Sequence, residues 1–245
     1  MSQSAKKVYV VIPAYQAQDT LGSVFARLPA EMAPKDVTYL VINDGSTDDT
    51  ARVAMEAATR VANVRLINHE RNRGYAQAQK TGFQMALAEG GEIMALLHSD
   101  GQYAPELLPE LLAPLERDEA DLVQGSRMAR PWDALRGGMP LYKWIANISL
   151  STMENMVYGM HMSEYHSGYM LYSRRCLETV PFMRLSDTFH FDGEMLFMAG
   201  KHKMRVKQIP IPTRYAGEKS HLRPIQYGFD VLKIMYRYRT GKYDF

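Results

Sequence analysis

The segment IMALLHSDGQYAPE, residues 93–106, changes abruptly from apolar to polar and then begins a helical pattern. Its first five residues are apolar without interruption, which is typical of a strand covered on both faces in a parallel sheet. The polar residues that follow would lie at the carboxyl end of this strand, and Pro105 suits the first turn of a helix. The segment therefore predicts a strand–loop–helix unit with Asp100 in the loop.

The same unit recurs on both sides of this segment. Apolar, β-branched runs begin at Val8, Val37, Val64 and Asp121, roughly 28 residues apart, which is about the length of one strand–helix unit. Helical patterns lie between them, at 47–62, 75–89 and 105–117. Regular alternation predicts an α/β fold with a Rossmann-like, mostly parallel sheet and helices on both faces. The rhythm stops after the fifth strand, which argues against an eightfold barrel.

Beyond residue 126 the pattern is different. A helical stretch covers 140–158, a short strand covers 168–173, and a second helical stretch covers 191–200. A proline-containing strand follows within MRVKQIPIP, residues 204–212. No low-complexity linker or internal repeat separates the two halves, so we expect one domain.

Composition excludes several classes of protein. The 245 residues are 46% hydrophobic and 23% charged, as in ordinary globular proteins, and the net charge of +2 argues against a nucleic-acid binder. A single cysteine, Cys176, excludes an internal disulfide and favours a reducing compartment. No apolar run reaches the roughly 18 residues of a membrane span, and no signal-peptide core is present. We therefore expect a cytoplasmic protein, either free or peripheral on the cytoplasmic face of a membrane.

Polar residues gather after four of the predicted strands. In open α/β sheets, ligands bind beyond the carboxyl ends of the strands, so these four ends would face one crevice. Neither a G-x-G-x-x-G motif after the first strand nor a P-loop is present, which disfavours a dinucleotide enzyme and a P-loop enzyme. The four strand ends are IPAYQ (12–16), NDGSTDD (43–49), HSDGQY (98–103) and QGSR (124–127).

Eight motifs, over roughly residues 7–225, resemble family 2 glycosyltransferases in order and spacing. They are most similar to the polyprenyl-phosphate branch, typified by dolichyl-phosphate mannose synthase. The resemblance implies a GT-A fold over 1–245, with a nucleotide-sugar-binding half at about 1–126, an acceptor half at about 127–223 and a C-terminal amphipathic helix at 224–245. The motifs are VIPAYQAQDTL, VINDGSTDDT, NRGYAQAQKTGFQMA, LLHSDGQYAPE, DLVQGSR, SGYMLYSRR, FHFDGEML and YAGEKSH.

The resemblance also implies how the donor nucleoside is held. Pro13, Tyr15 and Asp44 would contact its base and ribose, because a carboxylate accepts hydrogen bonds from a base N–H or from ribose hydroxyls. The alternative for Asp44 is a turn-capping residue. The family often has an Asn-Glu pair after the tyrosine, whereas this chain has Gln16 and Ala17, so the assignment stops at Tyr15.

Asp100 corresponds to the last carboxylate of the family's Asp-x-Asp triplet. The resemblance implies that it binds Mg²⁺ or Mn²⁺, which bridges the diphosphate of the donor. His98 replaces the first aspartate. It is either a ligand acceptable to Mn²⁺ or a neutral residue that hydrogen-bonds the sugar or phosphate. Gln102 would lie beside the metal or the donor phosphates.

The resemblance implies that the second half presents the acceptor phosphate, with Arg127 and Lys143 at basic positions of the family. The guanidinium fork of an arginine suits a phosphate, and the alternative for each basic residue is a solvated surface charge. The candidates are Arg127, Lys143, Arg214 and Lys219.

The motif FDGE adds two carboxylates, Asp192 and Glu194. In relatives that use a hydroxyl acceptor, a carboxylate in this region is the general base. A phosphate acceptor is already an anion, so Asp192 would then orient it. We expect Glu194 and His166 to contact substrate too. The alternative for both carboxylates is a favourable position at a helix N-terminus.

Residues 224–242 have the pattern of an amphipathic helix. Such a helix would either lie at a membrane surface or pack on the domain. Its apolar stripe is Ile225, Phe229, Leu232 and Tyr236, and its positive charges are Lys233, Arg237, Arg239 and Lys242.

The resemblance therefore implies an inverting, metal-assisted transfer of a sugar from a nucleoside-diphosphate donor to a polyprenyl phosphate. A membrane surface and a membrane-anchoring partner subunit are further candidate partners, and nucleic acid is not. Two alternatives stay open: transfer to a sugar hydroxyl in polysaccharide or lipopolysaccharide synthesis, and a non-catalytic nucleotide-sugar-binding subunit.

Overall fold

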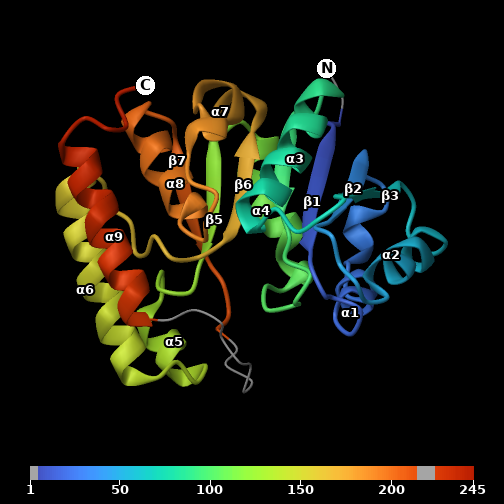
Figure 1. The fold of residues 1–245 in the computed structure, drawn as a ribbon, viewed down its shortest axis with the longest axis horizontal. Coiled ribbons are helices and arrows are strands. Elements are labelled where there is room, and N and C mark those ends of the chain that lie inside the picture. The colour runs from blue at the N-terminus through green and yellow to red at the C-terminus, as the bar shows by residue number, and fades with distance from the viewer. Residues whose placement is uncertain (1–4, 214–223) are drawn as a thin grey trace.

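The computed structural model describes residues 5–213 and 224–245 (Figure 1). Arg214, Lys219 and the motif YAGEKSH lie outside the described residues. Within the described ranges, seven strands form one sheet in the order β3-β2-β1-β4-β6-β5-β7. The strands are β1 (Val8–Ala14), β2 (Val37–Asn43), β3 (Val64–Asn68), β4 (Ile93–Leu96), β5 (Leu122–Ser126), β6 (Tyr169–Ser173) and β7 (Val206–Pro210).

Six of these strands run in the same direction, which confirms the predicted mostly parallel sheet. The exception is β6, which pairs antiparallel with both β4 and β5. The carbonyl oxygen of Gly168, just before β6, lies 3.1 Å from Nε2 of His98, just after β4. The chain has therefore returned to the carboxyl edge of the sheet before β6 begins, so β6 must run back in the opposite direction.

Most helices match the predicted ranges. The stretches predicted at 75–89, 140–158 and 191–200 are α3 (Tyr75–Ala88), α6 (Leu141–Tyr158) and α8 (Phe191–Lys201). The remaining α-helices are α1 (Leu21–Ala26), α2 (Thr50–Ala58), α4 (Leu108–Glu116), α5 (Pro131–Arg136), α7 (Arg174–Thr179) and α9 (Pro224–Arg239). Short 3₁₀ helices are η1 (Ala30–Met32), η2 (Pro105–Leu107) and η3 (Phe182–Arg184). The sequence reasoning missed the short helices α1, α5 and α7.

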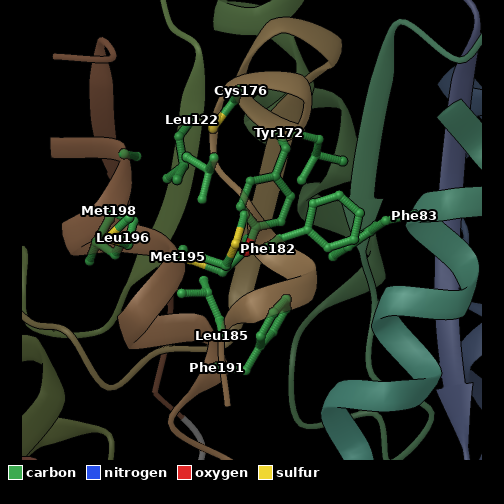
Figure 2. Close-up of a cluster of buried hydrophobic side chains, with 14 of the residues drawn as sticks. Phe83, Leu122, Tyr172, Cys176, Phe182, Leu185, Phe191, Met195, Leu196 and Met198 are labelled. Carbon is green, nitrogen blue, oxygen red and sulfur yellow. The ribbon is translucent and has the colours of Figure 1, made fainter. Parts of the chain in front are cut away.

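Helices cover both faces of the sheet, as predicted. Alternate residues of β1 point to opposite faces, so Tyr9 and Val11 belong to one buried cluster and Val10 and Ile12 to another. The first cluster, part of which is drawn in Figure 2, packs α3 and α8 against the sheet through Phe83, Tyr172, Leu196 and their neighbours. The second packs α1, α2 and α4 through Leu21, Ala54, Leu111 and others.

Helix α9 lies beside α6 at one edge of the molecule (Figure 1). Val231 and Met235 are buried, whereas Phe229, Leu232 and Tyr236 of the predicted stripe are exposed. The helix therefore packs on the domain and also keeps an apolar outer face. No helix among the described residues is both long enough and apolar enough to cross a membrane.

Candidate active site

A cleft of about 910 Å³ opens at the carboxyl edge of the sheet. Every described residue that was predicted to belong to the site lines this cleft, except Glu194. Their proximity confirms that the strand ends and the second half face one crevice, while the role of each residue stays a prediction. The residues brought together are Pro13, Tyr15, Asp44, His98, Asp100, Gln102, Arg127, Lys143, His166 and Asp192.

Asp44 is fixed by the loop that follows β3. Its carboxylate accepts hydrogen bonds from the backbone N–H groups of Arg73 (2.9 Å) and Gly74 (2.8 Å), and it lies 2.6 Å from Nδ1 of His69. Gly45, at φ 69°, makes the turn possible, because a Cβ there would lie 2.4 Å from the backbone of Arg71. Asp44 therefore caps this loop and lines the cleft at the same time.

His69 is a residue that the sequence reasoning missed. Its Nε2 lies 3.0 Å from Oγ1 of Thr81 on α3, so the imidazole links Asp44 to that helix. The signal that could have found it is its position directly after β3, because polar residues after the neighbouring strands line the cleft.

Asp100 lies exposed in the turn after β4. One of its oxygens accepts a hydrogen bond from the backbone N–H of Gln102 (3.0 Å), and Gly101 has φ 73°. The exposed carboxylate keeps acceptor capacity for a ligand in the cleft.

Tyr75, at the first turn of α3, joins two predicted site residues. Its hydroxyl donates to Oδ2 of Asp192 (2.8 Å) and lies 3.0 Å from Nε2 of His98. Because the same Nε2 lies 3.1 Å from the carbonyl oxygen of Gly168, that nitrogen carries a hydrogen. Burial lowers the pKa of His98, so the ring is neutral at pH 7. A metal contact through Nε2 would break both of these contacts.

Asp192, at the start of α8, is buried beside the cleft and is only 7% exposed. Desolvation raises the pKa of its carboxyl group from 3.8 to about 7, and the hydrogen bond from Tyr75 offsets part of that rise. Its Oδ1 makes no hydrogen bond of normal geometry within the described structure, although the side chain of buried Gln79 is close enough to lower the pKa of the carboxyl group as well. A carboxyl group with these properties is half-ionised near neutral pH, as a general base or a proton-holding group requires.

Arg127 follows β5 and is positioned by Glu164. The buried carboxylate of Glu164 accepts from the backbone N–H of Arg127 (2.5 Å) and lies 3.3 Å from its guanidinium, which also donates to the carbonyl of His166 (2.8 Å). Burial alone would raise the pKa of Glu164, but the charge of Arg127 and hydrogen bonds from Met128 and other groups hold it below its usual value. Glu164 was also missed, because it lies in a segment without periodic pattern.

Two further candidates lie at the same end of the cleft. Nδ1 of His166 lies 3.0 Å from the hydroxyl of Tyr227 on α9, and its Nε2 lies 3.2 Å from Glu154 on α6. Lys143, also on α6, lines the cleft. The end of the cleft near α6 and α9 therefore contains Arg127, Lys143 and an imidazole.

Glu194 does not lie in the cleft, contrary to the expectation that it contacts substrate. Its two oxygens accept hydrogen bonds from the backbone N–H of Ser186 (2.6 Å) and from the hydroxyl of Tyr243 (2.5 Å). Residues two apart on a helix point in different directions, so Glu194 cannot share the side occupied by Asp192. It holds the C-terminal residues against the loop before α8.

The protein ligands for a metal ion are few. Within residues 5–213 and 224–245, no group of three or more His, Cys, Asp or Glu side chains is placed to hold a metal ion. A hard divalent cation that keeps waters and phosphate oxygens in its shell needs only one or two carboxylates from the protein. The exposed carboxylate of Asp100 fits such a cation when a donor diphosphate supplies the other oxygens.

The chain is similar to proteins of one known family. The model of the family described as Glycosyl transferase family 2 matches residues 9–180. A UDP-N-acetylglucosamine–dolichyl-phosphate N-acetylglucosaminyltransferase of Methanococcus voltae is 27% identical, over 97% of this chain and 98% of the relative. A polyprenol monophosphomannose synthase of Mycolicibacterium smegmatis is 27% identical, over 84% of this chain and 77% of the relative.

The solved structures confirm the GT-A fold class. Glucosyl-3-phosphoglycerate synthase from Mycobacterium tuberculosis, in complex with phosphoglyceric acid, superposes with a TM-score of 0.67 at 20% identity, covering 95% of this chain and 80% of that one. A complex of that enzyme with Mn²⁺, uridine-diphosphate-glucose and phosphoglyceric acid gives a TM-score of 0.66 at 20% identity, covering 95% and 79%. The matched family model, over residues 9–180, spans well over half of the chain. The chain therefore belongs to glycosyl transferase family 2, and it is a glycosyltransferase similar to the dolichyl-phosphate mannose synthase-like branch.

Proposed function

We propose that this enzyme transfers a sugar, with inversion, from a nucleoside-diphosphate donor to a polyprenyl phosphate. The observation that supports this most directly is the distribution of charge in the cleft. Asp44 and Asp100 lie at the ends of β2 and β4, whereas Arg127 and Lys143 lie toward α6. Family membership sets aside the alternative of a non-catalytic nucleotide-sugar-binding subunit.

The donor would occupy the side of the cleft formed by β1, β2 and β4. Tyr15 is 51% exposed there and offers a ring on which a base can stack, while Pro13 and Asp44 lie beside it. Asp100 and Gln102 lie further along, where the diphosphate would follow the nucleoside. A divalent cation, Mg²⁺ or Mn²⁺, held by Asp100 and the diphosphate would offset charge on the leaving group.

The acceptor phosphate would bind near Arg127 and Lys143. Its oxygen attacks the anomeric carbon as the bond from that carbon to the donor diphosphate breaks, so one displacement inverts the configuration. A phosphate anion needs no base, and Asp192, held by Tyr75, would orient the acceptor or the sugar. His98, neutral and bonded to Gly168, fits a hydrogen-bonding role in the site better than a ligand role through Nε2.

One observation favours a second candidate acceptor. The pKa of Asp192, raised by burial to about 7, suits a general base that deprotonates a sugar hydroxyl. Transfer to a hydroxyl in polysaccharide or lipopolysaccharide synthesis is therefore the second candidate function.

A transfer assay with each acceptor class separates the two. Purified protein would be incubated with radiolabelled uridine- and guanosine-diphosphate sugars, Mn²⁺ or Mg²⁺, and either a polyprenyl phosphate or an oligosaccharide. We expect a charged lipid product from which mild acid releases the sugar, with the anomeric configuration inverted by NMR. Transfer only to the oligosaccharide would overturn the lipid-phosphate proposal and leave the hydroxyl acceptor.

A further inference from the structure

Six large apolar side chains lie exposed on neighbouring helices at one edge of the molecule. We call them the apolar surface: Trp132 on α5, Leu141, Tyr142 and Ile145 on α6, and Phe229 and Leu232 on α9. Their exposed fractions run from 40% for Leu232 to 66% for Trp132. Figure 1 shows α6 and α9 side by side, with α5 beside the first turns of α6. A concentration of this kind on one face is typical of a site that contacts another surface.

The outer side of α6 carries no charge. The 18 residues of this helix include two charged side chains, Lys143 and Glu154. Lys143 lines the cleft and Glu154 is buried, so neither belongs to the outer side. A solvated helix normally places its charges outward, so the arrangement in α6 is the reverse of the usual one.

Helix α9 does not need its exposed apolar residues for packing. Val231 and Met235 are buried, at 3% and 4% exposure, and they anchor the helix on the domain. Phe229 (58% exposed) and Tyr236 (71% exposed) point away from this buried side, and Leu232 lies at its margin. Phe229 and Tyr236 therefore leave more than half of their apolar surface uncovered by the described structure.

Basic side chains border the apolar surface, mainly on α9. Lys233, Arg237 and Arg239 flank the stripe on α9, where Asp230 is the single acidic residue and pairs with Lys233 at 3.0 Å. On α5, the side chain of Arg136 is 82% exposed and pairs with Asp133 at 3.3 Å. Cations around an apolar centre favour a partner that is apolar inside and anionic at its surface, which is the chemistry of an anionic lipid bilayer.

The apolar surface adjoins the acceptor end of the cleft. The neighbouring side of α6 lines the cleft through Lys143, Ala146 and Leu150, and α9 contributes Tyr227. Ala146 is exposed and lines the cleft as well, so the outer side of α6 continues into it. A lipid whose tail stays in a bilayer against this surface would have its phosphate group close to Lys143.

We propose that the apolar surface inserts into the headgroup region of an anionic membrane and so sets the orientation in which the cleft meets its lipid acceptor. This proposal rests on the proposed function for the identity of that acceptor. The apolar centre enters the boundary between headgroups and acyl chains, and the cations of α9 and α5 contact lipid phosphates. A second copy of the chain, or a membrane-anchoring subunit, would be a different occupant of the same surface.

Vesicle flotation of the full-length protein tests the proposal without any sugar donor. The vesicles would be phosphatidylcholine alone, or phosphatidylcholine with phosphatidylglycerol. The test variant combines Ile145→Glu and Phe229→Glu, neither of which lines the cleft. The matched control is Met55→Glu on α2, because Met55 is 63% exposed and α2 lies at the other side of the molecule (Figure 1). Circular dichroism and thermal melting would confirm that all variants fold.

We expect the wild type and Met55→Glu to float with anionic vesicles, and the double variant to lose about tenfold or more in vesicle partitioning. Equal flotation of the double variant and the wild type, or no flotation of the wild type, would overturn the proposal. Light scattering without lipid would reveal a dimer that the double variant dissociates, which would assign the surface to a second copy instead.

A parallel assay separates this proposal from the proposed function. The double variant should transfer sugar to a short, water-soluble polyprenyl phosphate at the wild-type rate, and should be at least about tenfold slower with a long acceptor in vesicles. Vesicle binding without transfer to either acceptor would refute the proposed function and leave the docking surface standing. Transfer to both acceptors at wild-type rates by the double variant would refute the docking surface alone.

Discussion

The two sides of the cleft are positioned in different ways. On the proposed donor side, Pro13, Tyr15 and Asp44 end or directly follow parallel strands, and Asp100 lies in the turn after β4. Asp100 is held by a backbone group only two residues away, whereas Asp44 is held by the loop after β3. On the acceptor side, defined by Arg127, Lys143, His166 and Tyr227, contacts join distant parts of the chain. Glu164 bonds Arg127 across 37 residues, and Tyr227 contacts His166 across 61.

This difference has a consequence for mutations. A residue that only extends from a strand end can be removed without disturbing the fold, so its loss should affect chemistry alone. A buried charged residue that joins distant segments should affect stability and binding together. Four substitutions test the contrast.

The largest effect on turnover is expected for Asp100→Ala. The exposed carboxylate makes one hydrogen bond, to the backbone N–H of Gln102, so the variant should fold normally. Removing the proposed metal ligand should lower kcat/KM by about a thousandfold, since a metal stabilises a leaving diphosphate by several kcal/mol. Steady-state assays with Mn²⁺, together with thermal melting, would measure both. Asp49→Ala, an exposed carboxylate outside the cleft, is the control, and wild-type turnover in Asp100→Ala would remove the assignment.

Glu164→Gln should lower the stability of the fold, whereas Asp100→Ala should lower turnover and leave stability unchanged. The carboxylate is fully buried and accepts hydrogen bonds from Ser126, Arg127 and Met128. Removing its charge leaves the guanidinium of Arg127 without its buried counter-charge, which should cost about 3 kcal/mol of unfolding free energy and raise KM for the acceptor. Urea denaturation and acceptor titrations would measure the two. A change in stability as small as that of Asp100→Ala would contradict the contrast between the two sides.

Asp192→Asn should change the pH dependence of stability. Because burial raises the pKa of Asp192 from 3.8 to about 7, the folded state binds this proton more tightly than the unfolded state. The proton contributes stability that is fully present below about pH 4 and is lost as the pH rises through about 7. The variant should therefore melt at a higher temperature than the wild type at pH 8, with a smaller difference at pH 5. Melting curves at both pH values test this, and parallel pH dependence of the two proteins would contradict it.

Of the four substitutions, Tyr75→Phe should have the smallest effect on kcat/KM. The hydroxyl of Tyr75 donates to Asp192 and thereby lowers the pKa of that carboxyl group, so its loss should move the pKa upward. If the ionised form of Asp192 is the active one, the acid limb of the kcat/KM profile should shift to higher pH by about half a unit to one unit. The pH–rate profile measures this, with Tyr9→Phe as control, because the hydroxyl of Tyr9 donates to a carboxylate, that of Glu89, outside the cleft. A profile that shifts toward lower pH would show that Tyr75 acts on Asp192 in another way.

Local pattern was sufficient for most of the fold. The first four predicted strands begin where the structure begins them, at Val8, Val37, Val64 and Ile93, because uninterrupted apolar runs are a property of short segments. The direction of β6 was not predictable from its own sequence, since it depends on the edge to which the chain has returned. Short α5 begins at Pro131, and its start was predictable, because proline is favoured in the first turn of a helix.

The sequence predicted which residues belong to the site better than it predicted which of them contact one another. Strand ends and family motifs brought Asp44, Asp100 and Asp192 to the same cleft. Nothing local indicates that Tyr75 meets Asp192, which is 117 residues away, or that Glu164 meets Arg127. The placement of Glu194 was foreseeable, because helical geometry separates it from Asp192 by more than half a turn.

The β4–β6 ladder has a mechanical consequence. It joins strands from the two halves in one continuous sheet, and the hydrogen bond between Tyr75 and Asp192 connects the same halves above that sheet. A hinge motion between the halves would have to bend the sheet and break that bond. The separation between the proposed donor and acceptor sides is therefore set when the chain folds, and the alignment that the proposed in-line attack requires would not depend on domain closure.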